Sequence, residues 1–102
     1  MQLPERIRVG PYEYKVSVQP NIHDRDGNRE YGNINYLDGQ IALNGTVDES
    51  RAVATFWHEV FHALDHCYSV KLSEQQTDQL GNALASFFLD NPELAPAWSQ
   101  PN

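Results

Sequence analysis

Two histidines four residues apart, His58 and His62, enclose a glutamate and two bulky apolar residues in the segment HEVFH. In a helix, two such imidazoles differ by about 40° around the axis and about 6 Å along it, so they project as neighbours from one face. They could then bind one divalent cation. Glu59 would point about 100° away from His58, close enough to take a proton from a water molecule on that ion. The pattern predicts metal-assisted hydrolysis.

We expect zinc as the ion, although the ligand types alone also admit cobalt, nickel or iron. A catalytic zinc site holds three protein ligands and a water molecule, whose pKa falls to about 7. Glu59 is the predicted general base, which passes the proton to the leaving amine. The competing interpretation is a helix with two ordinarily packed or solvated histidines. A chance HExxH has a probability on the order of 1 in 100 in such a short chain.

The third ligand is expected from the segment EQQTD, residues 74–78. Glu74 and Asp78 are four residues apart on one helix face, and Gly81, a further turn along this face, would let the two helices approach closely. Glu74 is the predicted metal ligand. Asp78 is the predicted hydrogen-bond partner of the far nitrogen of a ligand histidine.

Other polar residues of the first helix are too far along its axis to share the ion. His66 would lie about 12 Å and Asp65 about 10 Å beyond His58. Asp65 is therefore expected either to hydrogen-bond a ligand histidine or to be a solvated surface carboxylate. Cys67 is expected to be a small buried apolar side chain.

The elements that must position these residues predict an α+β fold. Before residue 47, four short segments alternate apolar and polar side chains, as half-buried strands do: RIRVG, YEYKVSVQP, REYGNINYL and GQIALN. Asp-Gly in DRDGNRE and in LDG favours tight hairpin turns. We therefore expect an antiparallel sheet of three or four strands, packed on two helices.

The first helix is predicted over residues 49–67, capped by Asp48 or Ser50, because apolar side chains recur there at spacings of three and four. A capping box of Ser73 and Gln76 predicts the start of the second helix, which Pro92 stops. The apolar residues expected to be buried are Val53, Phe56, Trp57, Val60, Leu64 and Cys67 on the first helix, and Leu80, Leu84, Phe87 and Phe88 on the second.

Length and charge bound the remaining expectations. The 102 residues suit a single domain, predicted over 1–92, followed by an irregular proline-rich tail over 93–102. A formal net charge of -7 without a basic cluster argues against nucleic acid and membrane surfaces as partners. No segment reaches the length of about 20 apolar residues that a membrane helix needs. With a single cysteine, we expect a cytoplasmic protein.

HExxH on one helix and ExxxD on the next resemble the gluzincin metallopeptidases, in particular the minimal gluzincins of phages and prophages. The likeness covers about residues 30–92 and includes the uncharged context of TFWHEVFHAL. It implies a zincin-like domain in which His58, His62 and Glu74 bind zinc and Glu59 is the general base.

The resemblance also implies that an edge strand upstream of the active-site helix, here GQIALN near Gly39–Asn44, pairs with an extended peptide or protein substrate. The metzincin pattern HExxHxxGxxH is not met, because Asp65 and Tyr68 stand where its glycine and third histidine belong.

Larger gluzincins add a Tyr or His from a further subdomain to stabilise the oxyanion, and this chain offers no clear counterpart. Tyr36 and Tyr68 are candidates, with core packing or surface display as the competing interpretation. The alternative function is a catalytically weak or inactive, zinc-stabilised module of the same fold that binds a partner protein. A third hypothesis is a tail that folds over the cleft through Glu93 or Trp98.

Overall fold

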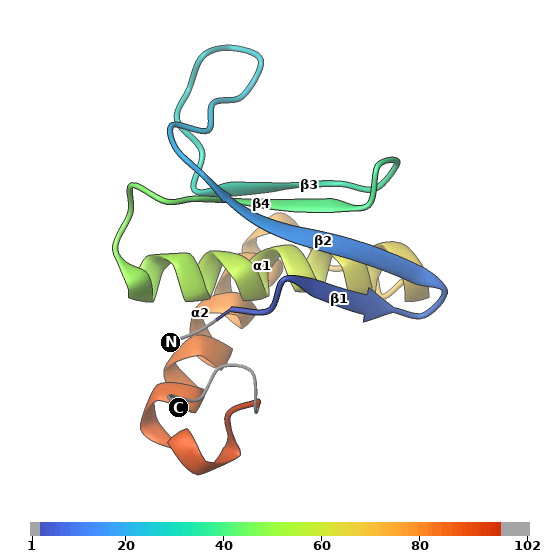
Figure 1. Ribbon diagram of the computed structural model, residues 1–102. Coiled ribbons are helices and arrows are strands. Elements are labelled where there is room, and N and C mark those ends of the chain that lie inside the picture. Colours follow the sequence, from blue (N-terminus) through green and yellow to red (C-terminus); the bar gives the residue numbers. More distant parts are fainter. Residues whose placement is uncertain (1–2, 97–102) are drawn as a thin grey trace.

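The computed structural model describes residues 3–96 (Figure 1). Trp98 and the rest of the tail from residue 97 lie outside the described residues. The elements in chain order are β1 (Arg6–Val9), β2 (Tyr12–Gln19), β3 (Gly32–Asn35), β4 (Gln40–Asn44), α1 (Glu49–Tyr68), α2 (Glu74–Asp90) and a short 3-10 helix, η1 (Pro92–Leu94). The fold is α+β, as predicted.

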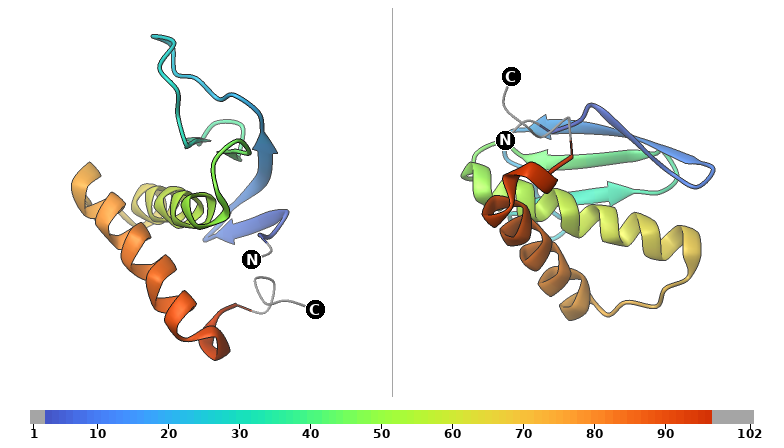
Figure 2. Two further views of the ribbon diagram at one scale, coloured as in Figure 1. Left: turned by 90° about the vertical axis from the view of Figure 1, so that its left-hand side faces the viewer. Right: turned by 90° about the horizontal axis from the view of Figure 1, so that it is seen from below.

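The molecule has three layers. A four-stranded sheet lies against one side of α1, and α2 crosses the other side of α1 (Figure 1). Figure 2 shows α1 end-on between the sheet and α2. Within the described residues, no helix is both long and apolar enough to span a membrane.

The sheet is mixed, with strand order β1-β2-β4-β3, so the expectation of a wholly antiparallel sheet is wrong. The β1–β2 and β3–β4 pairs are antiparallel, whereas β2 and β4 run parallel. The reason is the long connection over residues 20–31, which carries the chain to the far edge of the sheet. The β3–β4 hairpin then brings β4 back beside β2 in the same direction as β2.

The predicted edge strand is also corrected. β4 is a central strand, since Leu43 pairs with Val18 of β2 on one side and with Gly32 of β3 on the other. Four consecutive residues of β4, Ile41 to Asn44, are buried. An unbroken buried run is typical of a central strand, whereas an edge strand more often alternates. The edge of the sheet on the β4 side is therefore β3.

The two Asp-Gly turns differ in what they connect. Gly39 has φ +67° in the β3–β4 hairpin, where an added Cβ would lie 2.6 Å from the carbonyl oxygen of Glu13. Gly27 has φ +85°, the positive value expected for it. Its turn closes the excursion held by the bridge between His23 and Arg29, which projects above the sheet in Figure 1. It does not join two neighbouring strands of the sheet.

Both helix starts follow the predicted capping. The Asp48 side chain accepts a hydrogen bond of 2.9 Å from the backbone N–H of Arg51. At α2 the capping box is complete: Gln76 N–H donates to Ser73 Oγ at 3.0 Å, and Ser73 N–H donates to Gln76 Oε1 at 2.9 Å. α1 ends one residue later than predicted, and α2 ends two residues before Pro92.

The core lies between the sheet and α1. Its buried members come from both layers: Val9, Tyr14, Ile41, Leu43, Phe56 and Ala63. Val53 is buried on α1 as predicted, and Trp57, Val60, Leu64 and Cys67 pack at the margin of the core. Sequence reasoning therefore identified the buried side of α1 but not the buried Ala63.

The expected buried stripe of α2 is partly wrong. Leu80 and Phe87 are exposed, Leu84 and Phe88 are half-buried, and the fully buried residues are Thr77 and Gly81. α2 meets α1 along a line of small residues that continues to Leu84 and Phe88. Leu80 and Phe87 each precede a residue of that line by one position, so they are rotated about 100° toward solvent.

Candidate metal centre

The HExxH segment lies in the middle of α1, with its two histidines turned toward α2. The Nε2 atoms of His58 and His62 lie 3.1 Å apart. Glu59 lies beside them and is only 4% exposed. The predicted neighbouring imidazoles are thus present, and the glutamate between them is buried.

A glycine lets α2 approach this face of α1 closely. A Cβ added at Gly81 would lie 3.0 Å from the backbone oxygen of Ala54 and 3.0 Å from the backbone nitrogen of His58. Any side chain at this position would therefore push the helices apart. The predicted role of Gly81 in close helix approach is confirmed.

The short connection over residues 69–73 returns the chain so that the start of α2 faces the histidines. Ser69 and Lys71 adopt left-handed backbone conformations, with φ 54° and 65°. Lys71 N–H donates to Asp65 Oδ1 at 2.6 Å, which ties the connection to the last turns of α1. One oxygen of Asp65 is thus used by the connection. The expected hydrogen bond from Asp65 to a ligand histidine stays a prediction.

The first residue of α2 brings its carboxylate to both histidines. Glu74 Oε1 lies 3.0 Å from His58 Nε2, and Glu74 Oε2 lies 3.2 Å from His62 Nε2. The Glu74 side chain is 72% exposed, yet its carboxylate contacts the imidazoles. On the next turn, Asp78 Oδ1 lies 3.5 Å from His58 Nδ1, longer than a well-formed hydrogen bond.

These separations suit ligands of one small cation. Atoms bound to a tetrahedral zinc at about 2.0–2.1 Å lie about 3.3 Å from one another. The contacts among the two Nε2 atoms and the Glu74 carboxylate are 3.0–3.2 Å long. His58, Glu59 and His62 also offer ligand atoms within 4.8 Å of one another, and this group could hold a metal ion.

Burial sets the protonation of the site. The pKa of Glu59 is raised from 4.5 to about 8, first by burial and then by the negative charges of Glu74 and Glu30. Burial also lowers the pKa of His62, with repulsion from His58 acting in the same direction and Glu74 opposing it. A neutral imidazole is the form that binds a metal. The surroundings of His62 therefore favour the neutral imidazole, which is the form that can bind a cation.

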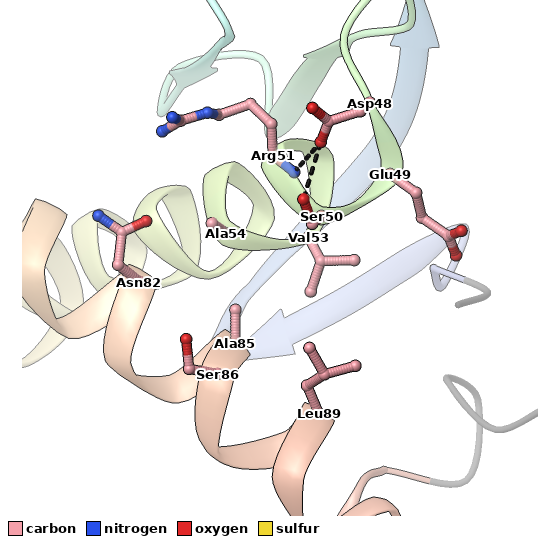
Figure 3. A pocket seen from close by; sticks show the side chains of 10 residues that line it. All are labelled: Asp48, Glu49, Ser50, Arg51, Val53, Ala54, Asn82, Ala85, Ser86 and Leu89. Atoms are coloured by element: carbon pink, nitrogen blue, oxygen red, sulfur yellow. Dashed lines mark hydrogen bonds between the residues drawn. The ribbon is translucent and has the colours of Figure 1, made fainter.

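A cleft of about 230 Å³, here called the His58 cleft, opens beside the candidate metal centre. Its lining comes from three elements and from the approach to β3, and includes Arg29, Glu30, Gly32, Arg51, His58, Glu59 and Asp78. A larger pocket of about 450 Å³ lies between the start of α1 and the second half of α2 (Figure 3). That pocket contains none of the predicted site residues.

Tyr36 lies near the candidate metal centre. Tyr68 is not among the residues that line the His58 cleft. The Tyr36 hydroxyl is 3.5 Å from the carbonyl oxygen of His62, and its ring stacks on His66 with centroids 4.2 Å apart. Burial raises the pKa of Tyr36, as does the charge of Glu59. Tyr68 is 61% exposed at the end of α1.

Sequence reasoning missed the arginines of the His58 cleft. Arg51 precedes His58 by seven residues, which in a helix is two turns and returns within about 20° to the same face. That spacing could have identified Arg51. Arg29 has no such local signal, because only the path of residues 20–31 brings it there.

Comparisons of the chain with protein-family models, with curated protein sequences and with solved structures found no match.

Proposed function

We propose that this chain is a zinc-dependent peptidase with a zincin-like domain. The observation that carries the proposal is the convergence of His58 Nε2, His62 Nε2 and the Glu74 carboxylate at 3.0–3.2 Å from one another. Next to them lies a buried glutamate whose carboxyl group no ion pair neutralises in the described part of the chain. A ligand set together with a separate carboxylate is what metal-assisted hydrolysis needs.

Zinc would be held by His58, His62 and Glu74, and when bound it would polarise the substrate carbonyl and lower the pKa of a water molecule. Glu59 has a pKa of about 8 in the absence of a cation, and a nearby cation favours its ionised form. The ionised carboxylate accepts the proton of the attacking water and delivers it to the leaving amine. Asp78, whose Oδ1 lies 3.5 Å from His58 Nδ1, is the residue expected to orient the His58 ring.

An extended peptide is expected to pair with β3, the corrected edge. Asn44 N–H donates to the Tyr31 carbonyl oxygen at 2.8 Å, so these two residues form a hydrogen-bonded pair of the ladder. The pattern alternates in an antiparallel pair, so the N–H and C=O groups of Gly32 and Ile34 point to the open edge. Gly32 also lines the His58 cleft. Backbone pairing there would hold a peptide beside the metal centre whatever its side chains.

The experiment that tests this proposal is Glu59→Gln in the zinc-loaded protein. Hydrolysis of an unfolded protein substrate is expected to fall about 10²–10⁴-fold, the usual contribution of a general base. Zinc content should stay unchanged, because Glu59 is not one of the three ligands. Glu5→Gln, at an exposed position, is the matched control and should retain full activity. A Glu59→Gln protein as active as the parent would rule out the general-base role.

The alternative is a zinc-stabilised module that binds a partner protein without hydrolysis. It is favoured by exposed apolar side chains on α2, with Leu89 72% and Phe87 47% exposed. It predicts the same zinc content as the peptidase and no cleavage by the parent. Cleavage of an unfolded protein, measured on zinc-loaded parent and Glu59→Gln, therefore separates the two functions.

A further inference from the structure

Two arginines line the His58 cleft of this acidic chain, beside three carboxyl groups, those of Glu30, Glu59 and Asp78. The protein has seven Lys and Arg against fourteen Asp and Glu. Two of those seven, Arg29 and Arg51, line this one cleft beside His58. Neither forms an ion pair within residues 3–96. The charge of Arg51 contributes, after hydrogen bonds, to the lowered pKa of Asp48, but no ion pair among the described residues fixes either guanidinium group, so both are available to a ligand.

Arg51 projects from the first turn of α1, on the same face as His58. Its guanidinium carbon lies 4.9 Å from the centre of the Tyr31 ring. Arg51 also lines the larger pocket, and in Figure 3 its side chain extends away from Ala85 and Leu89 on the other side of that pocket. A guanidinium stacked on an aromatic ring uses its face, which leaves the N–H groups at its rim free to donate. Arg51 is thus held in place without losing its capacity to bind an anion.

Arg29 approaches the same cleft from the chain that leads into β3. One of its terminal nitrogens donates to the Thr46 hydroxyl at 2.6 Å. This neutral contact fixes the side chain and leaves its charge uncompensated. A guanidinium has five N–H donors, so one hydrogen bond uses only a fraction of them.

The acidic groups of the cleft differ in their surroundings. Glu30 Oε2 accepts a hydrogen bond of 3.1 Å from the Asn33 amide. Asp78 lies against His58 Nδ1, and Glu59 is buried beside the metal centre. Ionised carboxylates only accept hydrogen bonds, so the two arginines are the charged donors that this cleft offers to a ligand.

We propose that the His58 cleft is a specificity subsite for a carboxylate of the substrate, the side chain of an Asp or Glu next to the scissile peptide bond. This inference rests on the proposed peptidase function and adds its substrate class. A cleft of about 230 Å³ has room for such a side chain, and guanidinium groups match the planar, two-oxygen geometry of a carboxylate. Arg51 and Arg29 are the residues that select it.

Two hydroxamates that differ only in a glutamate or a glutamine side chain test this subsite. The hydroxamate group binds zinc in both, so the difference in affinity reports the cleft alone. For the zinc-loaded parent, calorimetry should show the glutamate compound binding about tenfold more tightly or better, as charge-assisted hydrogen bonds allow. Arg51→Gln and Arg29→Gln should each reduce this ratio toward one. Arg25→Gln, in the exposed 24–28 turn, should leave it unchanged.

Reversing the charge of Arg29 and Arg51 gives a second test of the subsite. The double variant R29E/R51E should prefer a lysine-type hydroxamate over the glutamate compound. Independently, the sites at which the parent cleaves a peptide mixture should be enriched in Asp and Glu on one side of the cleaved bond. Equal affinities of the glutamate and glutamine compounds for the parent would overturn the subsite and leave the peptidase proposal standing. If the parent retains no zinc or binds neither compound, both proposals fail.

Discussion

Two carboxylates flank the same pair of histidines, one on the sheet side of α1 and one on the α2 side, and their surroundings differ sharply. Glu59 is 4% exposed, whereas the Glu74 side chain is 72% exposed. Burial raises the pKa of Glu59 to about 8. Glu74 reaches both Nε2 atoms from the solvent side. In the mechanism that we propose, these environments would make Glu59 the proton acceptor and Glu74 the metal ligand.

The buried carboxylate should make the zinc-free protein less stable as the pH rises. Because its pKa is raised from 4.5 to about 8, the folded state keeps a proton between these values that the unfolded state has released. Stability is therefore lost as the pH rises through this window. Zinc-free Glu59→Gln should be more stable than the zinc-free parent at pH 8, by at most about 5 kcal/mol, and the gain should shrink toward pH 4.5.

Urea unfolding of both zinc-free proteins at pH 5 and pH 8 measures this difference. Glu5→Gln controls for the loss of a surface charge. A gain from Glu59→Gln that is as large at pH 5 as at pH 8 would contradict the burial of an ionisable group at this position.

The exposed carboxylate of Glu74 should strengthen the binding of zinc. Glu74→Ala should weaken zinc binding more than about 100-fold, beyond the 10–100-fold typical of losing a hydrogen-bond partner of a ligand. Asp65→Ala is the matched control on α1, since Asp65 bonds the Lys71 backbone and should change zinc affinity far less. Competition with a metal indicator measures both affinities. Equal losses in the two variants would remove Glu74 from the ligand set.

The smallest effect should come from moving α2 without touching a polar group. Gly81→Ala would place a Cβ 3.0 Å from backbone atoms of Ala54 and His58, which cannot move aside as a side chain can. We expect a loss of about 1–3 kcal/mol in the free energy of unfolding. Zinc affinity should also fall, because Glu74 moves with α2 while His58 and His62 stay on α1. Gly81→Ala with unchanged stability and zinc affinity would show that the close approach is unimportant.

Features set by neighbouring residues were predictable from the sequence. The Ser73–Gln76 capping box, the helical spacing of His58 and His62, and the small residue at Gly81 all depend on local chemistry and helix periodicity. The start of α2 and the place of Glu74 therefore agree with the sequence. The same periodicity places Arg51 two turns before His58 on the same helix face, so its spacing could also have identified this residue.

Features set by long-range pairing were not predictable in this way. The alternating pattern of GQIALN does not show which strands lie beside it, and the parallel β2–β4 pair depends on the route of residues 20–31. The sequence therefore predicts β4 as an edge strand, whereas the edge on that side of the sheet is β3. Likewise, the apolar pattern of α2 does not show that the helix face with Thr77 and Gly81 packs on α1. The pattern therefore predicts that Leu80 and Phe87 are buried, whereas both are exposed.

The most direct test of the proposed metal centre is the zinc content per chain of the purified protein, by elemental mass spectrometry, for the parent and for His58→Ala. His58 contributes the Nε2 atom that lies 3.1 Å from His62 and 3.0 Å from Glu74. We predict one zinc ion per chain in the parent and almost none in the variant, with both proteins folded by circular dichroism. A parent without bound metal, or equal zinc in the two proteins, would contradict a zinc site at these residues.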